Sequence, residues 1–111
     1  MSGRITVHVL DTATGRPAAG MVLRLARLGP DAATLGNFLT NADGRCDGPL
    51  LEGSGLRRGL YELVFEVGQW RGDGAGFYDS VPIRFRIDDP GAHYHVPLLI
   101  APFGYSTYRG S

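Results

Sequence analysis

Three histidines and one arginine are the side chains of this sequence best suited to proton transfer or to electrostatic catalysis. His93 and His95 are separated by a single residue, and His8 lies near the other end of the chain. The imidazole ring has its ordinary pKa closest to neutrality, so it can accept or donate a proton there. Arg45 follows an Asp-Gly dipeptide, and its planar guanidinium could polarise a carbonyl oxygen or bind an anionic heterocycle. Each residue taken alone is also common on an ordinary solvated surface.

A metal site is an alternative use of the same histidines. His93 and His95 could supply two ligands and His8 a third, which is the ligand set of a three-histidine zinc site. The spacing is weak support, because no carboxylate that could orient these rings is evident beside them in the sequence. We therefore expect neither a metal nor a cofactor.

Other catalytic motifs are not found. The single cysteine, Cys46, excludes an internal disulfide, and we expect an unreactive, half-buried thiol there. The glycines between Gly72 and Gly76 lack the strand and helix that surround a dinucleotide-binding loop. In the turn before Arg45, we expect the Asp43 side chain to bond to the backbone.

Length and charge limit the class of protein. The chain has 111 residues and no net charge, which suits one domain over residues 1–111 and favours neither nucleic acid nor a charged membrane surface as a partner. No apolar run approaches the ~20 residues of a membrane-spanning helix, and no signal peptide is recognisable at the start. We expect a cytoplasmic protein.

Alternation of apolar and polar residues predicts an all-β fold. Turn residues separate short alternating runs, and 17 glycines and seven prolines disfavour long helices. The prediction is a two-sheet antiparallel sandwich of seven to eight strands with one short helix near residues 69–78. The expected strands cover residues 4–11, 21–28, 34–40, 59–67, 81–88, 93–100 and 104–109. In this pattern the histidines occupy outer faces, because the residues that alternate with them are apolar.

Four stretches of the chain carry a resemblance to a known family. They are His8–Thr12 continuing to Gly15–Ala18, the turn Thr40–Arg45, the run Gly59–Phe65, and His93–Leu99 leading to Tyr105–Ser111. Together they resemble the 5-hydroxyisourate hydrolases, the transthyretin-related enzymes of urate breakdown in purine metabolism. The final Tyr108-Arg-Gly-Ser111 is similar to the enzymes and not to the hormone-carrying transthyretins. The resemblance covers essentially the whole chain.

The resemblance implies a transthyretin-like sandwich, a hydrolase and a set of site residues. The implied reaction is ring-opening hydrolysis of 5-hydroxyisourate to 2-oxo-4-hydroxy-4-carboxy-5-ureidoimidazoline, without a cofactor. His8, Arg45 and His95 take the catalytic positions, and Ser111, Tyr108 and Thr107 the substrate-binding ones; His93 matches the family without a main chemical role. The resemblance also implies a homotetramer. An open sheet face is not concave, so a second subunit related by a two-fold axis would enclose the site.

Three other classes of function compete with this one. A non-catalytic transthyretin-like carrier would bind a small hydrophobic ligand, and an apolar channel without paired imidazoles would suit it better. A structural sandwich for adhesion would usually carry a secretion signal. A metallohydrolase would be sensitive to chelators.

Overall fold

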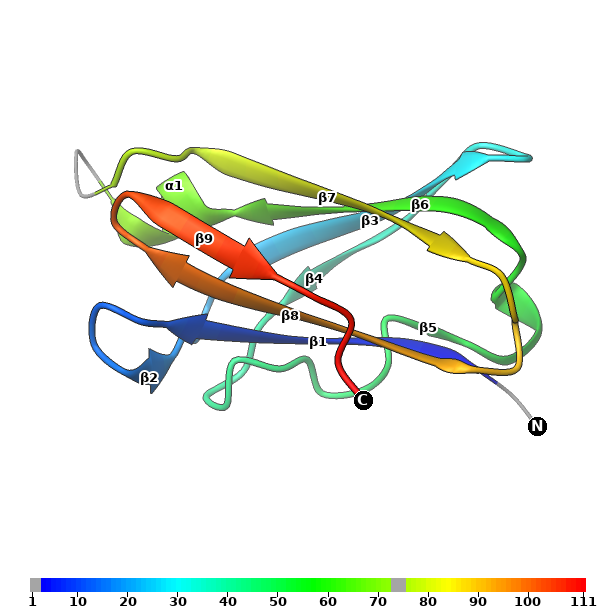
Figure 1. The fold of residues 1–111 in the computed structure, drawn as a ribbon, viewed down its shortest axis with the longest axis horizontal. Coiled ribbons are helices and arrows are strands. Elements are labelled where there is room, and N and C mark those ends of the chain that lie inside the picture. Colours follow the sequence, from blue (N-terminus) through cyan, green and yellow to red (C-terminus); the bar gives the residue numbers. More distant parts are fainter. Residues whose placement is uncertain (1–2, 73–75) are drawn as a thin grey trace.

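Two β-sheets pack face to face in the computed structural model, which describes residues 3–72 and 76–111 (Figure 1). The first sheet contains, in spatial order, β2 (Arg16–Pro17), β1 (Arg4–Asp11), β8 (His93–Ala101) and β9 (Gly104–Thr107), with β5 (Leu51–Glu52) paired to the start of β1. The second sheet contains β4 (Ala33–Leu39), β3 (Val22–Gly29), β6 (Gly59–Glu66) and β7 (Ser80–Ile87). A 3₁₀ turn (Gly53–Gly55) and the helix α1 (Val67–Arg71) complete the described elements.

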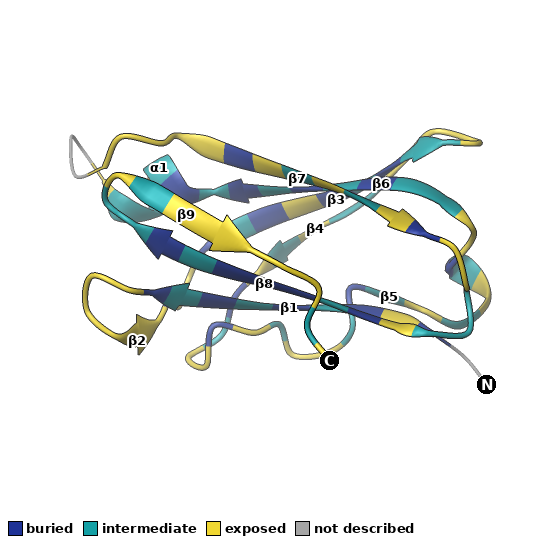
Figure 2. Cartoon of the chain, in the orientation of Figure 1, coloured by how far each residue is buried: buried dark blue, intermediate teal, exposed yellow. Residues whose placement is uncertain are grey.

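The core lies between the sheets and is built from every second residue of the long strands. Figure 2 shows this as buried bands that alternate with intermediate or exposed ones along long strands such as β1, β3 and β6. Burying one face of each strand removes apolar side chains from water, which is the main force that holds the sandwich together. The fully buried side chains include Ile5, Val9, Leu23, Leu25, Tyr61, Leu63, Phe65, Leu98 and Ile100.

The sandwich prediction is confirmed, with one difference in strand pairing. Every other pair is antiparallel, but β1 and β8 run parallel, with Thr6 opposite His95 and His8 opposite Pro97. Antiparallel neighbours are usually joined by a hairpin, whereas the stretch of sequence between these two strands contains all four strands of the second sheet. Their direction is therefore set by packing, which a local sequence pattern does not report.

The helix lies earlier than the predicted 69–78. α1 begins at Val67, whose buried side chain continues the inward face of β6, and it ends before Gly72, which has a φ of 90°. Glycine adopts that conformation with little strain, so it ends the helix. Residues 76–79 are not helical, and positions 73–75 of the predicted helix lie outside the described residues. None of the helices described is long and apolar enough to cross a membrane.

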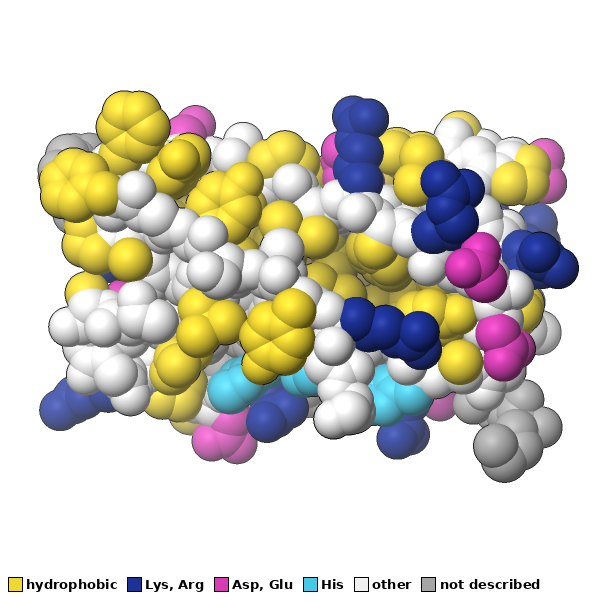
Figure 3. Space-filling model, viewed as in Figure 1, with side chains coloured by type: hydrophobic (Ala, Val, Ile, Leu, Met, Phe, Trp, Pro, Cys, Tyr) yellow, Lys and Arg dark blue, Asp and Glu magenta, His cyan; other side chains and the backbone are white. Residues whose placement is uncertain are grey.

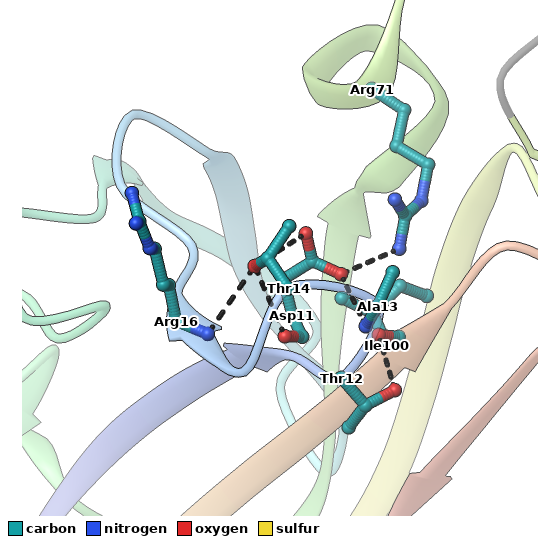
Figure 4. Close-up of polar contacts among 7 residues, drawn as sticks. All are labelled: Asp11, Thr12, Ala13, Thr14, Arg16, Arg71 and Ile100. Carbon is teal, nitrogen blue, oxygen red and sulfur yellow. Dashed lines mark hydrogen bonds and ion pairs between the residues drawn. The ribbon is translucent and has the colours of Figure 1, made fainter.

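A buried ion pair joins α1 to the end of β1 (Figure 4). Arg71 Nη2 lies 3.1 Å from Asp11 Oδ1, and both side chains are about nine-tenths buried, with exposures of 10% and 8%. The same carboxylate accepts hydrogen bonds from the Ala13 amide and the Thr14 hydroxyl. Asp11 therefore fixes the turn after β1 as well as the helix.

Candidate active site

The outer face of the first sheet carries all three histidines. Thr6 and His8 lie on β1, and His93 and His95 lie on β8, on the side opposite the buried residues of each strand. In the space-filling view, the imidazoles gather along the lower edge of the molecule beside arginine side chains (Figure 3). The predicted outer-face position of the histidines is thus confirmed.

Thr6 connects two of these imidazoles. Its Oγ1 lies 2.7 Å from His93 Nε2 and 2.8 Å from His95 Nδ1. The parallel register creates this contact, because it aligns Thr6 with His95 and Arg4 with His93. Sequence reasoning missed Thr6. The available signal was its place in the polar series Arg4, Thr6, His8, but the use of that signal required the register.

Arg45 reaches the site from the turn that follows β4. Asn41 builds this turn: its Oδ1 accepts hydrogen bonds from the amides of Asp43 and Arg45, at 2.9 and 3.2 Å. The side-chain-to-backbone bonding that we expected of Asp43 is therefore supplied by Asn41. Buried Thr40 anchors the turn, since its hydroxyl donates to the Ala18 carbonyl and accepts from the Met21 amide.

Gly44 allows the turn to approach β1 closely. The Val9 amide donates to the Gly44 carbonyl at 2.8 Å, and a Cβ on Gly44 would clash with the Val9 carbonyl oxygen. The φ of 73° at Gly44 also favours glycine. This contact holds Arg45, which follows Gly44, close to His8, which precedes Val9.

The C-terminal segment, residues 108–111, crosses the sheet beside His95. The Gly110 amide donates to the His95 carbonyl at 2.8 Å. Arg109 Nη2 donates to the His93 carbonyl at 3.2 Å, and its guanidinium lies 4.4 Å from the centre of the Tyr94 ring. These contacts bring Ser111 to the edge of the histidine cluster.

An open cleft of about 650 Å³ lies between the turn, the sheet face and the C-terminal segment. It brings together three predicted site residues, Arg45, His95 and Ser111, and adds His93 and Thr6. One chain therefore forms a concavity, which we did not expect of a bare sheet face. The remaining lining residues are Arg4, Val7, Asn41, Cys46, Asp47, Gly48 and Pro49.

Thr107 and Tyr108 lie elsewhere. They line a second cleft of about 320 Å³ between β7 and the C-terminal segment, and His95 borders both clefts. The Thr107 hydroxyl donates to the Pro97 carbonyl at 2.8 Å, so it is engaged with the backbone. Tyr108 is 60% exposed. Within one chain, these two predicted substrate-binding residues do not join Arg45 and Ser111.

Burial and nearby positive charge keep two histidines neutral. Burial first, and then the charges of Arg45, His93 and His8, lower the pKa of His95 below its usual 6.5. Burial and Arg45 also lower the pKa of His8, although the Asp43 backbone and carboxylate oppose this. His8 is not among the residues that line either of these two clefts. Neutral imidazoles next to a fixed cation can accept a proton from water and stabilise a developing oxyanion.

Cys46 lines the cleft but is poorly suited to act as a nucleophile. Burial, and then the Asp47 carboxylate, raise the pKa of its thiol. The thiol thus stays protonated near neutrality, whereas the thiolate is the reactive form. Across residues 3–72 and 76–111, no group of three or more His, Cys, Asp or Glu side chains is arranged to hold a metal ion.

Comparison with known proteins assigns this chain to a family. The model of the HIUase/Transthyretin family matches residues 5–110, and the chain belongs to that family. A 5-hydroxyisourate hydrolase of Mesorhizobium japonicum is 59% identical, with 98% of this chain and 93% of that protein covered.

Solved structures agree with the transthyretin-like fold. The 5-hydroxyisourate hydrolase of Klebsiella pneumoniae matches with a TM-score of 0.85 and 39% identity, over 98% of this chain and 99% of that one. An (S)-allantoin synthase matches with a TM-score of 0.94 and 46% identity over 99% of this chain, which spans 44% of that protein. Sparus aurata transthyretin, at 23% identity and a TM-score of 0.87 over 96% of both chains, shows the shared fold alone.

Proposed function

We propose that this protein hydrolyses 5-hydroxyisourate, opening its ring to 2-oxo-4-hydroxy-4-carboxy-5-ureidoimidazoline in urate breakdown. The observation that carries the proposal is the convergence of Arg45, His95 and Ser111 on one cleft. The 59% identity to a protein named 5-hydroxyisourate hydrolase supports the choice of substrate. A cytoplasmic location stays a prediction.

In the proposed reaction, water adds to an amide-like carbonyl carbon and a ring C–N bond breaks. Arg45 anchors the substrate and stabilises the charge that develops on the carbonyl oxygen. His95 removes a proton from the attacking water, because its lowered pKa leaves the ring neutral at physiological pH. The proton that His95 takes from water then passes to the departing nitrogen, with His8 as the second proton-transfer group. Ser111 contributes a polar contact to the substrate.

The proposal includes a homotetramer. The cleft of one chain is open, whereas small-molecule sites usually bury most of their ligand. A second protomer related by a two-fold axis would close it and would supply each site group twice. Exposed aromatic side chains also favour association, since Phe103 is 80% exposed and Phe77 is 71% exposed. Contact of Tyr108 with substrate would require such a partner or a rearrangement of the C-terminal segment.

The alternative is a non-catalytic carrier of a small ligand. The cleft fits such a carrier less well, because two guanidinium groups and two imidazoles line the space where an apolar ligand would bind. Similarity to transthyretin supports only the fold, at 23% identity.

The decisive experiment follows the decay of freshly generated 5-hydroxyisourate by its ultraviolet absorbance, with and without the protein. We expect rapid, enantioselective decay with the protein and only the spontaneous rate with His95→Ala, provided that the variant has the same oligomeric state. Stoichiometric binding without turnover would favour the carrier function over the hydrolase function. Decay at the spontaneous rate without binding would exclude both functions.

A further inference from the structure

The hydroxyl of Thr6 has one proton and two imidazole partners. Its Oγ1 lies within hydrogen-bond distance of both His93 Nε2 and His95 Nδ1. A hydroxyl can donate one hydrogen bond and accept two. If it donates to one ring nitrogen, the other ring nitrogen must donate to it. The two rings therefore play opposite parts in this short chain of hydrogen bonds.

The direction of these two hydrogen bonds decides which nitrogen of His95 carries the proton. When Thr6 donates to neutral His93, His95 donates through Nδ1–H, and its Nε2 is an unprotonated base. When His93 is protonated, both of its nitrogens carry protons and its Nε2 must donate to Thr6. The hydroxyl then turns towards His95 Nδ1, and the proton of neutral His95 resides on Nε2.

The C-terminal segment restricts the orientation of the same ring. A Cβ on Gly110 would lie 2.5 Å from His95 Cδ2, so the backbone runs directly along that edge of the imidazole. With Nδ1 bound to Thr6 and Cδ2 covered by Gly110, the ring exposes Cε1 and Nε2. Nε2 is thus the nitrogen of His95 that is available to a reactant.

We propose that Thr6 is a positioning residue that couples His93 to His95, so that neutral His93 holds His95 with an unprotonated Nε2 available to the cleft. The inference rests on the proposed hydrolysis and assigns a part to His93, which acts through Thr6 without touching substrate. His93 is exposed, whereas His95 is half-buried.

Other charged groups surround the pair, and they act in both directions. Arg45 and His8 oppose protonation of His95, as does protonated His93. On His8, the Asp43 carboxylate acts in the opposite sense. The ionisable or charged residues that line the two clefts bordered by His95 are Arg4, Arg45, Cys46, Asp47, His93, Arg84, Arg86, Asp88, Tyr94, Tyr108 and Arg109, with Ser111 at the end of the segment. A test must therefore remove the hydroxyl and leave these charges in place.

Thr6→Val removes the hydroxyl while it preserves the shape and the β-branched backbone preference of threonine. The first test is nitrogen NMR of the imidazoles in substrate-free protein at pH 7.5. We expect wild type to show His95 protonated on Nδ1, and Thr6→Val to show a mixture of both neutral forms. Thr6→Ser should restore the wild-type spectrum. An unchanged His95 tautomer in Thr6→Val would overturn the proposal, and this readout does not depend on any hydrolase activity.

The second test uses the pH dependence of kcat/KM. We expect Thr6→Val to lose about tenfold or more, as supporting hydrogen bonds of catalytic imidazoles typically contribute, with Thr6→Ser close to wild type. His93→Gln should move the acidic limb of the profile further in wild type than in Thr6→Val, because in Thr6→Val the hydrogen-bond coupling is already broken and only the charge of His93 still acts on His95. Equal displacement in both backgrounds would refute the coupling. The exposed Thr34→Val in β4 is the matched control for loss of a strand hydroxyl.

Discussion

The Gly110 amide donates a hydrogen bond to the carbonyl of His95 at 2.8 Å, and its Cα lies against the His95 ring. No side chain fits between the two, since a Cβ would lie 2.5 Å from Cδ2 and the shortest tolerated contacts are near 3.0 Å. The close approach explains why a glycine is needed in the penultimate position of the sequence.

Gly110→Ala should therefore displace either the imidazole or the C-terminal segment. We expect kcat/KM to fall by about tenfold to a hundredfold, since small displacements of catalytic groups have such effects, with little change in the melting temperature. Gly104→Ala is the matched control, because a Cβ at that position meets nothing within 4 Å. Steady-state kinetics and thermal melts of both variants test this. Equal activity of the two variants would show that the contact is unimportant.

Arg45 should matter both to turnover and to the proton affinity of the histidines. We expect Arg45→Ala to lower kcat by about 10²–10³, the usual effect of losing one oxyanion-stabilising donor. The pKa values of His8 and His95 should rise, because the cation that opposes their protonation is gone. NMR titration of the imidazoles measures this. Arg57→Ala, an exposed arginine in a 3.8 Å pair with Asp31, should change neither quantity.

The lowered histidine pKa values predict that acid destabilises the protein. The unfolded chain binds protons at pH values near 6.5, where His8 and His95 in the folded protein do not. The contribution of these two histidines to the stability of the folded protein is therefore fully present above pH 6.5. It is lost as the pH falls towards their folded pKa values. Urea unfolding from pH 7.5 to 5 at constant protein concentration measures the trend. In a His8→Gln, His95→Gln double variant, the free energy of unfolding should change less steeply with pH. An unchanged slope would contradict the attribution of the acid sensitivity to these two histidines.

Asp11 should stabilise the fold more than surface carboxylates do. Asp11→Asn removes the charge that faces Arg71, whose Nε is already buried without a hydrogen-bond partner. Loss of one member of a buried pair typically costs about 3 kcal/mol. The exposed pair Asp31–Arg57 provides the control, for which we expect less than about 1 kcal/mol from Asp31→Asn. Chemical denaturation of the two variants gives both values.

Cys46 should be dispensable for catalysis in spite of its place in the cleft. Its raised pKa predicts slow alkylation by iodoacetamide at pH 7 and turnover within about twofold of wild type for Cys46→Ala. Some stability should be lost, because the side chain packs against the core. Fast alkylation that abolishes turnover, together with an inactive alanine variant, would instead identify a nucleophilic thiol.

The sequence by itself determined the sandwich and the strand faces, and it supplied the candidate site residues. Alternation in Arg4–Asp11 and His93–Ala101 identified the buried side of each strand, because a strand places successive side chains on opposite faces. The outward position of the histidines followed directly. The family resemblance then singled out Arg45, His95 and Ser111, which meet at one cleft.

Only the tertiary structure decided which of these residues touch. The parallel pairing of β1 with β8 joins segments almost ninety residues apart, and it alone places Thr6 between His93 and His95. The separation of Thr107 and Tyr108 from Arg45 likewise depends on the path of the C-terminal segment across His95. Strand periodicity is a local property of the chain. Strand order, direction and register are set by how whole sheets bury their apolar faces, and therefore by contacts that no short stretch of sequence contains.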